Sequence, residues 1–111
     1  MSRNEENTNS QAINICIKVY TIGKEIMIAA CDLAILGKTL KGDGFDFHVS
    51  KEFYDDIRGN EELLKKHLEK ATIANLVGKK CVKCGIEMGL IMEENVLYIE
   101  DIPHAQFALM I

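Results

Sequence analysis

The segment from Ala71 to Ile91 most constrains the fold, because a continuous apolar run meets a second amphipathic segment there across a single glycine. The run Ala71 to Val77 is too continuously apolar for a surface helix, so we predict a buried helix that ends there. Asn75 lies inside the run, and a buried amide needs hydrogen-bond partners. Gly78 is predicted to end the helix in a left-handed conformation, so that a second helix begins at Lys79.

The start of this second helix carries Lys79 and Lys80, where the helix dipole favours acidic residues. Six of the eleven lysines lie between positions 65 and 83, and Glu69 is the only acid among them, so the segment is +5 in a chain of −4. Unpaired backbone N–H groups and two lysines suit a phosphate. The candidates for binding a phosphate or RNA are Asn75, Gly78, Lys79, Lys80 and Lys83. The alternative is that these lysines form a solvated helix face.

The N-terminal half predicts two β-hairpins. Apolar and polar residues alternate over Ile13 to Tyr20, and a turn around Gly23 leads to a second strand over Glu25 to Asp32. The segments Lys38 to Lys41 and Phe45 to Val49 predict the second hairpin. A single helical turn is expected after Asp32, and a short helical segment from Ser50 to about Ile57, which residues 58–60 end.

Two long helices and a last pair of strands are predicted to follow. Asn60 is expected to cap the first helix, and the second runs from Lys79 to about Gly89. The strands are expected at Asn95 to Ile99 and Ala105 to Ile111, with a turn at residues 101–103. The fold class is therefore α+β: a mostly antiparallel sheet of two hairpins and a C-terminal strand pair, with two main helices on one face.

Length and composition predict one domain. Residues 1–12 are a polar tail and residues 13–111 the single α+β domain. The net charge of −4 argues against a protein that coats nucleic acid through bulk electrostatics. No apolar run approaches the roughly 18 residues that suggest a membrane span, so we expect a cytoplasmic protein without membrane contact. Its four cysteines are expected to be reduced.

Cys81 and Cys84 form a CxxC motif at the start of the second helix. The helix dipole and nearby lysines favour a lowered thiol pKa, as in redox motifs. Helical phase favours the other interpretation, in which both cysteines pack into the core beside Met88 and Ile91. A zinc site lacks partners, because His48, His67 and His104 have no ligand spacing beside the motif. We predict no metal and no cofactor.

His104 and Gln106 project together from one face of the last predicted strand. With Asn75 they form a secondary set of uncharged polar candidates for a recognition site. The alternative is that these residues lie on the ordinary solvent-exposed face of a sheet. No nucleophile lies at a readable spacing from a base, so no catalytic residue is proposed and an enzyme is the less favoured class.

Several segments together resemble one known family: KVY, AACD, LGKT, ATIANLVGKK, GIEMGLI and IPHAQ. They resemble a small archaeal family catalogued as a domain of unknown function, the four-two-four family. The most specific pieces are IANLVG and PHAQ, and the resemblance runs from about Ile13 to the C-terminus. It implies an archaeal, cytosolic single domain, and it implies no activity and no functional residues.

The sequence leaves three hypotheses about function. The first is a non-enzymatic module that binds a phosphate-bearing ligand, most plausibly RNA, at residues 75–83. The second is a protein interaction or assembly module whose last strand, QFALMI, pairs with a partner or with itself. The third is a CxxC thiol-redox or small-molecule enzyme.

Overall fold

The structure is a computed structural model and describes residues 12–109. The predicted polar tail at residues 1–12 lies outside the described residues apart from Ala12. In chain order the elements are β1 (Ile15–Ile22), β2 (Glu25–Asp32), η1 (Leu33–Ile35), β3 (Thr39–Lys41), β4 (Asp46–His48), α2 (Lys51–Tyr54), β5 (Ile57–Gly59), α3 (Glu61–Leu68), β6 (Ile73–Val77), α4 (Lys79–Glu87), η2 (Glu93–Asn95), β7 (Leu97–Ile99) and β8 (Ile102–Ala108).

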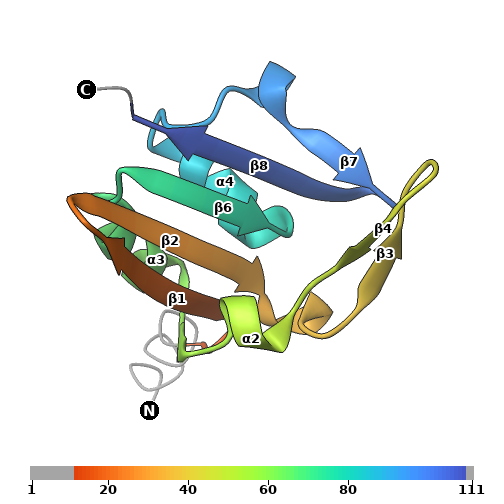
Figure 1. Cartoon of the computed structure of the whole chain (residues 1–111), viewed down its shortest axis with the longest axis horizontal. Helices are drawn as coiled ribbons and strands as arrows, with labels where there is room; N and C mark the ends of the chain where they lie inside the picture. Colours follow the sequence, from red (N-terminus) through yellow and green to blue (C-terminus); the bar gives the residue numbers. More distant parts are fainter. Residues whose placement is uncertain (1–11, 110–111) are drawn as a thin grey trace, which may run out of the picture.

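One six-stranded sheet organises the chain, in the order β5-β1-β2-β6-β8-β7 (Figure 1). Strands β1 and β2 form the first predicted hairpin, in which Ile22 pairs with Glu25 across a two-residue turn. Among the described strands of this sheet, only β2 and β6 pair in parallel. The prediction of an α+β fold with a mostly antiparallel sheet is therefore confirmed in its class, and the strand layout differs.

The central strand β6 shows that the helix predicted at Ala71 to Val77 is wrong. It pairs with β2 on one side and with β8 on the other. Its side chains enter both cores, with Leu76 on one sheet face and Val77 on the other. A strand buried on both faces is continuously apolar, and such a run cannot be told from a buried helix by periodicity alone.

The helices α3 and α4 cover one face of the sheet, behind it in Figure 1, as the sequence predicts. Asn60 caps α3 because its side chain accepts the backbone N–H of Leu63 at 2.9 Å. Helix α3 ends at Leu68 and is eight residues long. The core on this face buries these residues: Ile15, Ile17, Ile28, Ala30, Leu64, Leu68, Ala71, Ala74, Leu76, Cys81, Val82, Cys84, Ile91 and Ala105.

The opposite face is covered only in part, by η1, α2 and the β3–β4 hairpin. This second predicted hairpin forms, but as a separate two-stranded sheet that projects beside the end of β7 (Figure 1). It does not join the main sheet, which corrects the predicted layout. The core on this face consists of Cys16, Ala29, Cys31, Ile35, Leu40, Val49, Tyr54, Val77 and Ile99.

In the C-terminal strand pair, β7 begins later than the predicted Asn95, at Leu97, and the last strand begins earlier than predicted. Strand β8 starts at Ile102, and the turn before it lies at Glu100 and Asp101, whose φ angles are 52° and 67°. Two residues with positive φ suit the tight turn of a twisted hairpin. Residues 110 and 111 of the predicted last strand lie outside the described residues. Strand β5 was not predicted, because the sequence there favours a helix end followed by a break.

Candidate functional site

Three uncharged polar side chains meet on the sheet face opposite α3 and α4. The Asn75 side-chain oxygen Oδ1 accepts the hydroxyl of Tyr54 at 2.7 Å and lies 3.3 Å from Nε2 of His104. Since an amide oxygen only accepts, the ring proton of His104 sits on Nε2 in this bond. The other ring nitrogen, Nδ1, then remains an acceptor.

The neutral state of His104 follows from its surroundings. Partial burial lowers the pKa of His104, because the imidazolium loses hydration. The ring packs against Phe47 of β4, with 4.9 Å between ring centroids. Gln106 lies directly opposite Asn75 in the β6–β8 register, so the structure brings together all three secondary polar candidates of the sequence.

An apolar hollow opens beside His104, and we call it the open-face groove. Its volume is about 440 Å³, within the range of small binding sites. Phe45 is 53% exposed and Leu97 66% exposed at its walls. A smaller hollow of about 260 Å³ shares Leu97 and His104 with it. The groove is lined by Gly42, Asp43, Phe45, Phe47, Leu97, Tyr98, Ile99 and His104, and the smaller hollow also by Asn95, Ala105 and Gln106.

The charged residue that lines the open-face groove is an acid, Asp43, and no lysine or arginine lines it. Residues 93–109 contain four acids and no lysine or arginine. On the facing hairpin, the Lys41 side chain forms an ion pair with Asp46 at 3.2 Å, and the Lys41 backbone N–H donates a hydrogen bond to the carboxylate of Glu100. Asp43 lines the groove and forms no ion pair with another described residue. The residues that line the groove therefore carry one negative charge, on Asp43, and no lysine or arginine.

The start of helix α4 holds an internal anion where the sequence predicts a bound phosphate. The carboxylate of Asp32, only 8% exposed, accepts the backbone N–H of Lys80 at 3.0 Å and that of Cys81 at 3.1 Å. Asp32, at the end of β2, thus caps helix α4, which follows the neighbouring strand β6. The sequence predicted instead that Asp32 precedes and caps the helical turn directly after β2. The backbone donors needed for a phosphate are already used.

Gly78 makes this contact sterically feasible. Its φ of 108° is a conformation that L residues rarely adopt, and a Cβ there would lie 2.4 Å from Cγ of Asp32. Gly78 is therefore required at the junction of β6 and α4. The sequence suggested that Gly78 ends a helix, but in the structure it follows strand β6.

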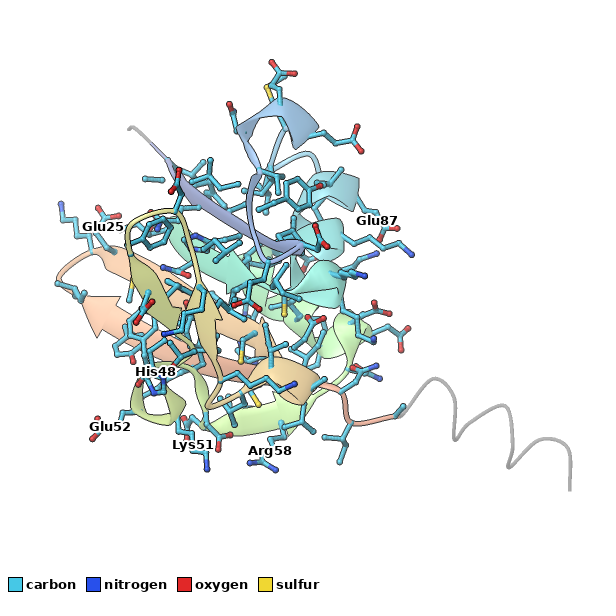
Figure 2. The ribbon with its side chains drawn as sticks, turned by 90° about the vertical axis from the view of Figure 1, so that its right-hand side faces the viewer. Glu25, His48, Lys51, Glu52, Arg58 and Glu87 are labelled. Carbon is cyan, nitrogen blue, oxygen red and sulfur yellow. The ribbon has the colours of Figure 1, made fainter. Side chains whose placement is uncertain are left out.

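The cluster of lysines is partly neutralised. Lys65 pairs with Glu87 at 2.8 Å and Lys83 approaches the same carboxylate at 3.9 Å. Figure 2 labels Glu87, which projects from α4 at the outside of the molecule. Lys79 and Lys80 are exposed and form no ion pair within residues 12–109.

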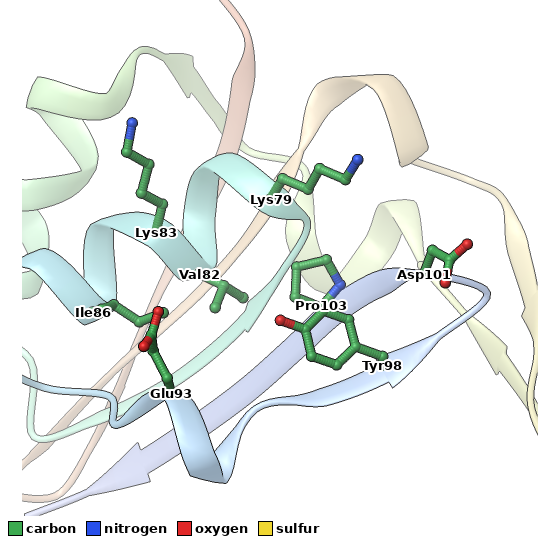
Figure 3. A pocket seen from close by; sticks show the side chains of 8 residues that line it. All are labelled: Lys79, Val82, Lys83, Ile86, Glu93, Tyr98, Asp101 and Pro103. Carbon is green, nitrogen blue, oxygen red and sulfur yellow. The ribbon is translucent and has the colours of Figure 1, made fainter.

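Two of these lysines line a further hollow of about 340 Å³. Lys79 and Lys83 rise from α4 on one side, and Glu93, Tyr98 and Asp101 come from the opposite side (Figure 3). Val82, Ile86 and Pro103 also line it. Because acids face the lysines, this hollow is of mixed charge.

Both cysteines of the CxxC motif are buried in the core under α4. Burial raises the pKa of the Cys81 thiol well above its ordinary value and that of Cys84 to about 11. These shifts are opposite to the lowered pKa that a redox motif needs. Cys16 and Cys31, directly opposite each other in β1 and β2, are also buried with raised pKa values, again mainly because burial disfavours the thiolate.

Within the described part of the chain, no three His, Cys, Asp or Glu side chains are grouped to hold a metal ion. No helix of residues 12–109 is long and apolar enough to cross a membrane.

The family described as "Protein of unknown function (DUF424)" matches residues 20–110. The chain belongs to the DUF424 family. This confirms the resemblance that the sequence segments suggested, and the family description assigns no activity.

A solved structure supports the fold. The crystal structure of an uncharacterized conserved protein from Methanopyrus kandleri is 19% identical, with a TM-score of 0.72. The match covers 88% of this chain and 95% of that one. No curated protein matches the chain. At this identity the likeness shows a shared fold.

Sequence reasoning missed three residues of this arrangement. The sequence places Phe47 in a strand and Tyr54 in a short helical segment, and the residues that they contact lie on distant strands. Asp32 stands at the end of an otherwise apolar strand, and a charge at such a position is a signal for a buried partner.

We predict that Asp32→Ala destabilises the protein by about 1 to 3 kcal/mol, because two buried backbone donors lose a charged acceptor. The free energy of unfolding from denaturant titration measures this loss. Inorganic phosphate should then stabilise the variant more than the wild type, because the vacated helix start can bind it. An equal gain in both proteins would argue against Asp32 as the occupant of that site.

We also predict that the four thiols react slowly with a disulfide reagent at pH 8 in the folded protein, because burial suppresses the thiolate. All four should react within minutes once guanidinium unfolds the chain. Fast modification of Cys81 or Cys84 in the folded protein would revive the redox hypothesis.

Proposed function

We propose that this DUF424 protein is a non-enzymatic protein interaction module, and that a basic partner segment with an apolar anchor residue binds in the open-face groove. The observation that carries this proposal is the pair of exposed side chains, Phe45 and Leu97, placed around a neutral His104 in a groove whose charged lining residue is Asp43.

The apolar part of the groove supports a protein ligand. Large apolar side chains gathered on a surface and rimmed by polar groups are typical of interaction sites. Phe45 comes from the loop before β4 and Leu97 from β7, so two distant segments supply one patch. Neutral Asn75, Gln106 and His104 add hydrogen-bonding groups without adding charge.

The charge at the groove favours a basic partner. Asp43 lines the groove, and Glu100, which directly follows the β7 wall, accepts the backbone N–H of Lys41 on the facing hairpin. Complementary charge steers a partner and excludes ligands of like charge. A polyanion such as RNA finds no lysine or arginine among the residues that line the groove.

A peptide in which leucine alternates with lysine tests the proposal by fluorescence polarisation. Phe45→Ser/Leu97→Ser should weaken its binding at least about tenfold, because each serine removes an apolar contact worth about 1.5 kcal/mol or more. A matched peptide of leucine and glutamate should bind at least about tenfold more weakly than the lysine peptide.

The control for this experiment is Ile22→Ser, which removes an equally exposed apolar side chain, 60% exposed, at the β1–β2 turn. It should bind the lysine peptide as the wild type does. An equal loss in the control, or equal binding of both peptides, would contradict the proposal.

RNA binding by the exposed lysines of residues 66–80 is a second candidate function, and one observation supports it. Lys79 and Lys80 are exposed and unpaired within the described residues, as Lys66 and Lys70 are. Such a surface would contact phosphates through side chains alone, because Asp32 uses the backbone donors of α4.

A titration with single-stranded RNA at two salt concentrations tests this candidate. Lys79→Ala/Lys80→Ala should weaken binding and reduce the salt slope by about 0.7 for each phosphate that the variant no longer neutralises. The control Lys24→Ala/Lys38→Ala removes two exposed lysines from the β1–β2 turn and from the residue before β3. An equal effect of both variants, or no binding by the wild type, would reject the candidate.

An archaeal source and a cytoplasmic location, both suggested by the sequence, stay predictions alongside these functions.

A further inference from the structure

The outer edge of strand β8 is open in its second half. Strand β7 pairs only with Ile102, Pro103 and His104. Among residues 12–109, no strand lies beside Ala105 to Ala108 on the side away from β6. The segment QFALMI, residues 106–111, which the sequence suggested as a pairing strand, contributes Gln106, Phe107 and Ala108 to this open half.

The register identifies which backbone groups are available. Pro103 accepts the N–H of Gly78 at 2.9 Å, and Leu109 donates to Thr72 at 2.7 Å. In an antiparallel ladder, alternate residues bond to the same side, so the odd-numbered residues of β8 bond to β6. The N–H and C=O groups of Gln106 and Ala108 therefore point outward, and the side chains of both residues are exposed.

A hollow lies where β7 begins beside this edge. It is the smaller hollow of about 260 Å³, lined by Asn95, Leu97, His104, Ala105 and Gln106. Leu97 and His104 also line the open-face groove. The free backbone groups are thus continuous with the apolar patch.

Resting on the proposed function, we infer that the partner segment binds as an added β-strand along the outer edge of β8, in line with β7. Its backbone bonds to Gln106 and Ala108, as in other complexes that extend a sheet. Because side chains alternate along a strand, one apolar residue enters the hollow between Leu97 and His104 while its neighbours point away. Lysine or arginine among those neighbours meets the exposed acid Glu94, which directly precedes Asn95 of the smaller hollow.

Charge selects a foreign basic segment over a second copy of this chain. Strand pairing between two copies about a two-fold axis would bring residues 93–101 of one copy toward the same residues of the other. That segment contains four acids and no basic residue. Like charges facing each other across paired strands destabilise the pairing, whereas a basic strand is attracted.

Proline substitution at the edge tests the inference with the leucine–lysine peptide. Gln106→Pro removes an outward N–H and leaves the β6–β8 ladder intact, and proline is tolerated in edge strands when its nitrogen faces solvent. It should weaken peptide binding by about tenfold, the effect of removing one or two hydrogen bonds. Gln106→Ala, which keeps the N–H, should bind as the wild type does.

A second variant and a second measurement keep the test decisive. Ala108→Pro probes the other outward N–H if Gln106→Pro lowers the melting temperature. In the wild type, the peptide should slow amide hydrogen exchange at Gln106 and Ala108.

The outcomes separate this inference from the proposed function. Binding that depends on Phe45 and Leu97 but not on either proline overturns the added strand and leaves the groove proposal standing. No binding by the wild type, or no dependence on the groove residues, rejects both. A dimer in sedimentation that both prolines dissociate would show that a second copy occupies the edge, and would also overturn the inference.

Discussion

The contact between Asp32 and the start of helix α4 connects the main parts of the fold. It joins the end of β2 to the junction of β6 and α4 through two charge-assisted hydrogen bonds. It fixes the parallel neighbours β2 and β6 at the same end of the sheet, where Cys31 pairs with Val77. Gly78 is the residue that lets the carboxylate approach so closely. Helix α4 therefore begins where the sheet holds it, and the face opposite α4 is left for the polar cluster and the groove.

This internal anion also changes how the positive charge of the molecule is interpreted. In the sequence, residues 65–83 suggest a phosphate site at a helix start. In the structure, one acid from outside the segment occupies the helix start and another, Glu87, pairs with two of its lysines. Two of its lysines, Lys79 and Lys83, line a hollow together with the acids Glu93 and Asp101, whereas the charged residue that lines the open-face groove is Asp43. The positive charge is therefore partly balanced from several directions, and the groove itself carries none.

The sequence predicts those elements whose patterns are local. The first hairpin follows from strict alternation, and helix α4 follows from the glycine before it and its amphipathic phase. The family is identified from short motifs along the chain. Strand β6 is mispredicted, because burial on both faces removes the alternation that marks a strand. The sequence identifies Asn75, His104 and Gln106 as polar candidates for a site. It does not identify Tyr54 and Phe47, because these residues contact Asn75 and His104 only through the tertiary fold.

The parallel pairing of β2 with β6 has a consequence for how the chain folds. The first hairpin closes through neighbouring residues, but the central strand must return from far along the chain, as the bonds between Ile26 and Thr72 across 46 residues illustrate. Closing so long a loop costs conformational entropy before its contacts contribute any stability, and such topologies fold slowly. Until β6 arrives, the apolar edge of β2 has no neighbour, so the centre of the finished sheet is the most aggregation-prone edge of the folding chain.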